Sequence, residues 1–135
     1  STYTGDTVVR EGTLLVPAAA PAGAILPNSV VEVCAGATLA FETDAKAELQ
    51  GLRIGETAGT VAGLRLAPGM SVYLPAGAVK GMKLPLAVEG CANPSRLAGV
   101  NVFVDGVADT RLGLELKADG LYLGGSKRST VIIIR

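Results

Sequence analysis

Residues 8–16 read VVREGTLLV: two short apolar runs on either side of a polar break that ends in glycine. The same arrangement returns as VVEVCAGATLAF at 30–41, LRLAPGMSVYL at 64–74 and LELKADGLYL at 114–123. Apolar and polar residues alternate within these runs, which is typical of strands with one buried face. Glycine tolerates the positive φ that a tight turn or bulge requires, so we expect a structural turn at each break. The four breaks end in Gly12, Gly36, Gly69 and Gly120.

Other short strands are expected between these units, and no segment shows the sustained helical periodicity and caps of an amphipathic helix. The additional strand segments are AELQGLRIG (47–55), GTVAGLRLA (59–67), MKLPLAVEG (82–90) and VNVFVDG (100–106). A recurring pair of strands predicts an all-β fold in which short strands stack as a β-solenoid. The spacing of the units is uneven, and a β-sandwich, especially over residues 82–135, is the alternative fold.

The length of 135 residues favours a single domain, here residues 1–135, with enough chain for its own core. Within it we expect repeat-like coils over residues 1–81 and a C-terminal β cap or subdomain over residues 82–135. The chain opens without Met or a signal segment. We therefore expect that it is a piece of a longer protein.

The composition disfavours several classes of function. Twelve basic and twelve acidic residues give a formal net charge of zero, with no basic face for nucleic acid. The apolar runs are too short to span a membrane. Histidine is absent, which removes the commonest general base and metal ligand, and the three Tyr and two Phe suggest no platform for stacking sugars or bases.

The opening residues 1–16, STYTGDTVVREGTLLV, resemble the autotransporter-associated β-strand repeat, also called the passenger-associated transport repeat, of form NTYTGGTTVxxGTLxV. Asp6 replaces the second glycine of that motif, and Ser1 replaces its Asn. The residues that match are Tyr3, Thr4, Gly5, Thr7, Val8, Gly12, Thr13, Leu14 and Val16. The resemblance implies a right-handed β-solenoid located outside the cell or on its surface. It implies no catalytic residue. The remainder of the chain, from KLPLAVEG through NVFVDG to the final VIIIR, resembles the C-terminal region of large secreted repeat proteins.

The candidate catalytic and ligand-binding residues are better explained as members of turns. Asp105 and Asp109 in VDGVADTR do not follow the alternating oxygen pattern of a calcium loop, and Asp105-Gly106 is a common hairpin turn. Lys127 in GLYLGGSKRST is one position late for a phosphate loop, and a β run follows it where a helix should begin. We therefore predict no catalytic residue, no metal site and no cofactor.

The two cysteines, Cys34 and Cys91, match no zinc or redox spacing. In an exported chain they could pair, and the loop so closed would stabilise the fold by about 4 kcal/mol in the chain-entropy model. The alternative is two unpaired thiols, and the sequence leaves both open.

The segment STVIIIR at 129–135 contains a β-branched run made of Val131, Ile132, Ile133 and Ile134. A run of this kind is either an ordinary core strand or an assembly strand that pairs with another chain.

These observations lead us to expect an exported structural module that self-assembles into an extracellular fibre or surface array by β-edge or end-to-end contacts. Its partner would be itself, with other surface proteins or glycans as further candidates. The alternative is an adhesin or ligand-binding domain whose loops at 17–29, 42–48 and 91–99 form a binding face. A third possibility, an enzyme of the polysaccharide-lyase kind, would require Asp105, Asp109 and Lys127 to act together.

Overall fold

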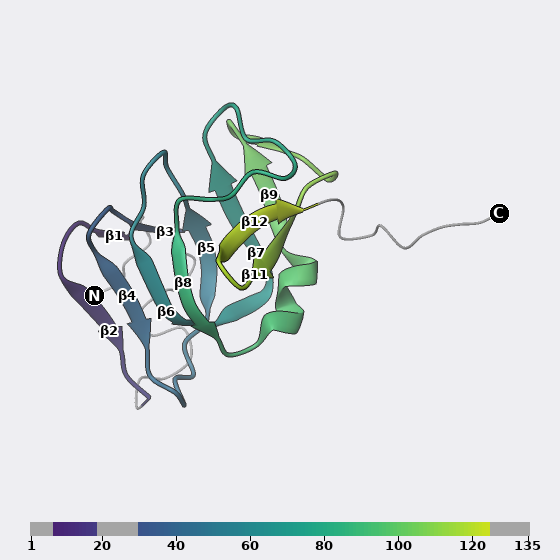
Figure 1. The fold of residues 1–135 in the computed structure, drawn as a ribbon. Coiled ribbons are helices and arrows are strands. Elements are labelled where there is room, and N and C mark those ends of the chain that lie inside the picture. Colours follow the sequence, from purple (N-terminus) through teal and green to yellow (C-terminus); the bar gives the residue numbers. More distant parts are fainter. Residues whose placement is uncertain (1–6, 19–29, 125–135) are drawn as a thin grey trace.

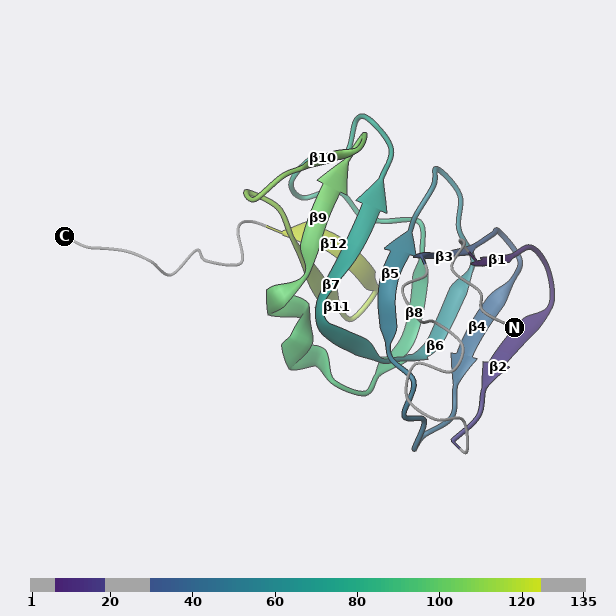
Figure 2. The ribbon, with the colours of Figure 1, turned by 180° about the vertical axis from the view of Figure 1, so that it is seen from behind.

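The structure is a computed structural model that describes residues 7–18 and 30–124. From residue 7 to residue 104 the strands alternate between a six-stranded and a four-stranded sheet (Figures 1 and 2). Consecutive coils are paired in parallel in both sheets. The chain therefore winds as a β-solenoid of about three turns, as the sequence predicts.

The strands are short because each one spans only one side of a coil. The six-stranded sheet consists of β1 (Thr7–Val9), β3 (Val30–Val33), β5 (Leu49–Arg53), β7 (Leu66–Leu74), β9 (Asn101–Val104) and β10 (Val107–Ala108). The four-stranded sheet consists of β2 (Thr13–Val16), β4 (Thr38–Phe41), β6 (Thr60–Leu64) and β8 (Ala87–Cys91). A 3₁₀ helix, η1 (Pro94–Gly99), and a hairpin of β11 (Gly113–Lys117) and β12 (Gly120–Gly124) complete the described part.

The core is built from ladders of aliphatic side chains that repeat from coil to coil. In the six-stranded sheet the register stacks Val31 on Leu52, Leu52 on Val72 and Val72 on Val102, and all four side chains are buried. In the facing sheet Leu39 stacks on Val61, and both are buried. β-Branched and Leu side chains fill the narrow space between two parallel sheets, which explains the near absence of aromatic residues from the core.

The coils turn a corner between the two sheets, and the glycine of the sequence pattern lies at two of these corners. Gly12 separates β1 from β2 and Gly36 separates β3 from β4, with φ of 73° and 84°. A residue with a Cβ is strained in this region, so the recurring glycine has a local physical cause. Gly69, with φ of 70°, lies instead inside β7, and Gly120, with φ of 150°, begins β12.

Two of the four pattern units do not form a coil corner. Residues 66–74 make a single strand whose two halves both pair with β5, and the register shifts between Leu49 and Gly51. Residues 114–123 fall in the antiparallel hairpin β11–β12, in which Lys117 opposes Gly120. The same alternation therefore produces a bulged strand, a hairpin or a coil corner, depending on which segment lies beside it.

The β-sandwich alternative is wrong for residues 82–124. β8 and β9 pair in parallel with β6 and β7, so the coil stack continues beyond residue 81. Helix η1 and the hairpin β11–β12 lie beyond them at the right of Figure 1, where the yellow hairpin crosses in front of the last coil. The coil stack therefore includes β8 and β9, and η1, β10 and the hairpin β11–β12 are called the cap here.

Candidate functional site

The outer edges of β1 and β2, the first described strands of the stack, are called the open rim here. Within residues 7–18 and 30–124, β1 pairs with β3 alone and β2 with β4 alone. The side chains of Val8 and Leu15, on these two strands, are 39% and 50% exposed. The hydroxyl oxygen of Thr7 is buried and has no hydrogen-bond partner in the described part of the chain. The rim therefore combines unpaired strand edges with exposed aliphatic side chains.

The hydrogen bonds to the second coil show which backbone groups face outward. Val9 O accepts a bond from Cys34 N–H (2.9 Å), and Val16 O accepts one from Glu42 N–H (3.0 Å). Alternate residues of a strand direct their backbone groups to the same side. The N–H and C=O groups of Val8 and Leu15 consequently point away from the second coil, toward the open side of the rim.

The opposite end of the stack is capped. β10 folds back antiparallel on β9 through a turn at Asp105 (φ 52°) and Gly106 (φ 80°), which confirms the hairpin turn predicted there. The hairpin β11–β12 adds an antiparallel bridge between Lys83 and Tyr122 beside β8. An antiparallel turn-back ends a parallel ladder, so the end formed by β9 and β10 does not offer the parallel edge that the rim offers.

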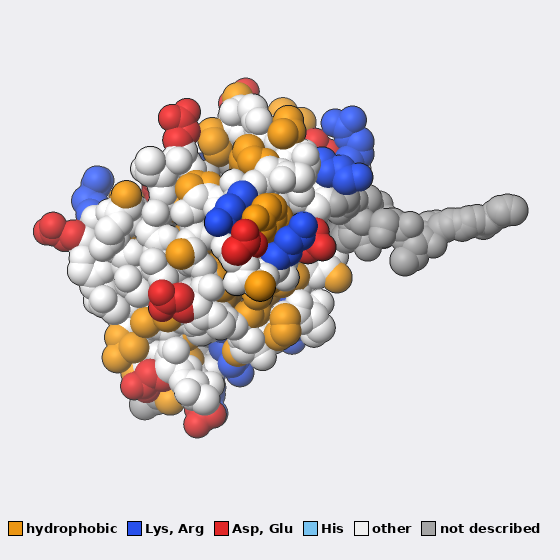
Figure 3. Space-filling view, in the orientation of Figure 1, with side chains coloured by type: hydrophobic (Ala, Val, Ile, Leu, Met, Phe, Trp, Pro, Cys, Tyr) orange, Lys and Arg blue, Asp and Glu red, His pale blue; other side chains and the backbone are white. Residues whose placement is uncertain are grey.

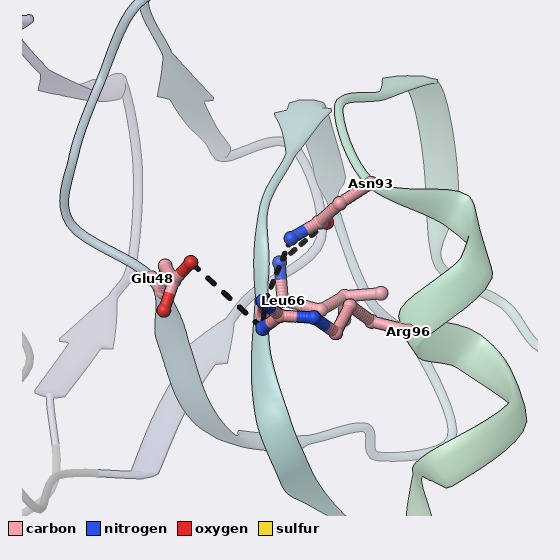
Figure 4. A network of polar contacts seen from close by, with 4 residues as sticks. All are labelled: Glu48, Leu66, Asn93 and Arg96. Atoms are coloured by element: carbon pink, nitrogen blue, oxygen red, sulfur yellow. Dashed lines mark hydrogen bonds and ion pairs between the residues drawn. The ribbon is translucent and has the colours of Figure 1, made fainter.

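An asparagine and an arginine attach helix η1 to the last full coil (Figure 4). Asn93 accepts a bond from Leu66 N–H at 3.0 Å and donates one to Leu66 O at 2.9 Å, as a neighbouring strand would. Arg96 donates to the same carbonyl at 3.2 Å and lies 3.9 Å from the carboxylate of Glu48. These bonds satisfy the backbone N–H and C=O of Leu66, which is fully buried, at a point where the regular strand pairing is interrupted.

Of the three loops expected to form a binding face, the segments 42–48 and 91–99 and the start of 17–29 are described and are linked by polar contacts. Ala18 N–H donates to the Glu42 carboxylate at 2.7 Å, and the ion pair of Arg96 with Glu48 joins the segments 42–48 and 91–99. Residues 19–29 lie outside the described part. In the segment 42–48, Ala45 and Ala47 are buried and face the core. The polar groups named here are used within the protein, so these segments offer few free groups to a ligand.

A groove lies under the long β7–β8 connection. Its volume is about 550 Å³, and residues 54–56, 74–78 and 82–85 line it. Ile54, Leu74 and Leu84 in its walls are nearly fully buried, and Glu56 and Lys83 are its charged residues. This volume lies in the range of roughly 300–1,000 Å³ that is usual for ligand pockets, and the lining is mainly apolar.

Two half-buried aromatic residues, Tyr73 and Phe103, form a stack whose ring faces are occupied. The rings of Tyr73 and Phe103, on neighbouring strands, are 5.1 Å apart at an interplanar angle of 23°. The guanidinium of Arg53 lies 5.5 Å from the Tyr73 ring centre, on the strand at its other side. Both faces of Tyr73 are therefore covered, and the stack does not present a flat ring to a sugar or base.

The hairpin carries the main polar cluster of the face shown in Figure 3, where basic and acidic side chains surround hydrophobic atoms. Tyr122 donates its hydroxyl to Asp119 at 2.7 Å, and the ammonium group of Lys117 lies 4.7 Å from its ring centre. Lys83 Nζ is 3.9 Å from Asp119. The hydrogen bond from Tyr122 stabilises the Asp119 carboxylate and lowers the pKa of Asp119. The same hydrogen bond stabilises the protonated phenol and raises the pKa of Tyr122.

The Tyr122–Asp119 bond should be visible in a spectrophotometric titration. We expect the phenol of Tyr122, identified by subtracting the curve of Tyr122→Phe, to ionise above the ordinary value of 10.0. In Asp119→Asn the midpoint should fall toward that value, because the negative charge that disfavours the phenolate is gone. Asp105→Asn, in the other hairpin turn, is the control and should leave the midpoint unchanged. Equal midpoints for Asp119→Asn and the unmodified protein would contradict the contact.

The acidic residues considered as catalytic candidates do not form a joint site. Asp109 accepts bonds from Arg111 N–H (2.9 Å) and from its guanidinium (3.2 Å), which lowers the pKa of Asp109 and raises that of Arg111. Asp105 lies in the β9–β10 turn, and Lys127 lies outside the described residues. Among the described residues, no group of three or more His, Cys, Asp or Glu could hold a metal ion.

Cys34 and Cys91 are free thiols and are not paired in this structure. Cys34 follows β3 and lies beside Gly59 at the start of β6, whereas Cys91 is in register with Leu64 at the end of that strand. The length of β6, 5 residues, separates them. At roughly 3.3 Å per residue this is about 16 Å, beyond the Cα separation of a disulfide. The predicted assembly strand, Val131 to Ile134, lies outside the described residues.

Comparison with protein-family models, with curated proteins and with solved structures found no match to this chain. Over residues 7–18 and 30–124, no helix has the length and apolar character needed to cross a membrane. The rim, the cap and the groove are the features of the described chain that bear on its function.

No local sequence pattern marks the residues that hold the cap and the coils together. Asn93 lies in the loop predicted at 91–99 and directly precedes Pro94, where η1 begins. Its partner Leu66 is distant in sequence, and no local pattern links the two. The groove likewise depends on three segments that meet only in the folded chain.

Proposed function

We propose that this chain is a non-enzymatic, exported structural module that self-associates through the open rim of its first coil. The observation that carries the proposal is the asymmetry of the stack: Val8 and Leu15 present unpaired backbone groups at one end, whereas β10 turns back on β9 at the other. Unpaired strand edges are templates for pairing with further strands. The resemblance of residues 1–16 to autotransporter-associated repeats supports a location outside the cell or at its surface.

The same asymmetry favours a closed assembly over an unlimited fibre. A head-to-tail fibre needs two complementary ends, and a capped end offers no parallel ladder to an open one. Two open rims can meet about a two-fold axis, which joins the solenoids into a longer stack with a cap at each outer end. An extended surface array would need a second contact in addition to the rim.

Lysine substitutions on the rim test whether it mediates self-association. We expect the unmodified protein to sediment as a dimer at micromolar concentration, and the variant Val8→Lys/Leu15→Lys to associate at least tenfold more weakly. Lysine on an edge strand opposes edge-to-edge pairing, and the two-fold axis would bring like charges together. The matched control is Val79→Lys/Val107→Lys, which changes two valines that are 60% and 68% exposed away from the rim.

Analytical ultracentrifugation and negative-stain images decide the outcome. A monomeric unmodified protein would overturn self-association, and regular fibres would overturn the closed dimer. Equal weakening in the control variant would show that added charge, rather than the rim, controls association.

A ligand-binding or adhesive role is the second candidate, and the groove of about 550 Å³ under the β7–β8 connection is the observation that favours it. Specific binding of a surface glycan or protein by a monomeric chain would support this role over the structural one.

A further inference from the structure

We propose that the C-terminal segment 129–135, STVIIIR, binds in the apolar groove of its own chain, with Val131 to Ile134 against the groove wall and Arg135 beside Glu56. The groove is the one described above, formed by residues 54–56, 74–78 and 82–85. Three observations support this binding: the place where the described chain ends, the length of chain that follows, and the chemistry of both partners.

The described chain ends beside the groove. Leu123 N–H donates to Met82 O at 2.9 Å, and Leu123 O accepts from Gly81 N–H at 2.7 Å. Met82 is one of the groove residues, so the strand that precedes the tail is hydrogen-bonded to the segment that forms one wall. Any chain that continues past Gly124 starts next to this wall.

The tail is long enough to reach the groove. Residues 125–135 follow Gly124, and at roughly 3.3 Å per residue an extended chain of this length spans about 36 Å. A short tether of this kind holds the segment at an effective concentration of the order of millimolar. Even a modest intrinsic affinity for the groove is then enough to keep the segment bound.

The two partners match in chemistry. Val131 to Ile134 are all β-branched and apolar, and such a run in water is an aggregation hazard unless it is covered. The groove offers the partly or fully exposed apolar side chains of Ala78, Met82 and Pro85. Glu56 at the groove forms no ion pair within the described part of the chain and is exposed. Arg135, directly after the apolar run, supplies the complementary charge.

The test uses a chain shortened after Lys127 and a fluorescent peptide of residues 125–135. Fluorescence anisotropy should show saturable binding of the peptide to the shortened chain. Binding to the full chain should be at least tenfold weaker, because its own tail occupies the groove. The variant Ala78→Lys of the shortened chain, with a charge placed in the groove, should bind the peptide at least tenfold more weakly. The matched control Ala98→Lys, on η1, should bind it unchanged.

A charge exchange gives a second measurement if Ala78→Lys fails to fold. Glu56→Lys in the shortened chain should weaken binding, and a peptide with Arg135→Glu should recover it. Absence of peptide binding, or binding insensitive to both groove variants, would overturn the proposal.

Sedimentation separates this inference from the proposed function. Docking within one chain leaves the oligomeric state of the shortened chain unchanged. Loss of association on shortening would show that the segment pairs between copies, which overturns docking within the chain. A monomeric unmodified protein would overturn self-association through the rim without affecting the peptide measurements.

Discussion

Replacing Gly59 by alanine should destabilise the protein by about 3 kcal/mol or more, because the site has no room for a methyl group. A Cβ at this position would overlap the carbonyl oxygens of Ala37 and Cys34 and would approach Val33 Cγ1 to 2.9 Å. Two of these contacts are with backbone atoms, which cannot rotate away. Gly59 also donates its N–H to Val33 O and accepts a bond from Ala87 N–H, so a shift would disturb the coils on both sides.

Urea denaturation followed by circular dichroism measures this loss. The stability of a domain is only about 5–15 kcal/mol, so Gly59→Ala should unfold at a much lower urea concentration or fail to fold. Gly99→Ala is the matched control, because no atom lies within 4 Å of the Cβ it would add. Its unfolding free energy should change by less than about 0.5 kcal/mol. Similar midpoints for the two variants would contradict the close approach of the coils at Gly59.

The sequence predicts the coil corners well because their causes are local. In VVREGTLLV the alternation places Val9 and Val16 inside, and Gly12 supplies the positive φ of the corner between them. The Asp-Gly turns at residues 105–106 and 119–120 were also predicted from their own residues. Each of these features depends on a few consecutive positions.

The sequence predicts less where the outcome depends on a neighbouring coil. The alternation in LRLAPGMSVYL is the same as in the corner units, yet both of its halves pair with β5 and it forms one bulged strand. Gly59 resembles any turn glycine until the Cys34 and Ala37 carbonyls of the preceding coil are placed beside it. The open rim, the cap and the groove are arrangements of distant segments, and they carry the functional argument.

The attachment of the cap through Asn93 has the second large expected effect. Asn93→Ala should lower the free energy of unfolding by about 2–3 kcal/mol. The substitution leaves the N–H of Leu66 without its partner, and Leu66 is 0% exposed, so water cannot replace the lost bond. The carbonyl of Leu66 keeps its bond from Arg96, which limits the loss.

The control is Asn101→Ala, which removes a side-chain bond to Gly69 O (3.2 Å) at an exposed site where water can take its place. We expect this variant to lose less than about 1 kcal/mol. Hydrogen exchange adds a local readout, since the amide of Leu66 should exchange much faster in Asn93→Ala than in Asn101→Ala. The bonds with Asn93 protect the backbone of Leu66 at the start of β7. When they are lost, we expect β7 to open locally before the first coils unfold. Unchanged protection of Leu66 in Asn93→Ala would mean that another group satisfies its backbone.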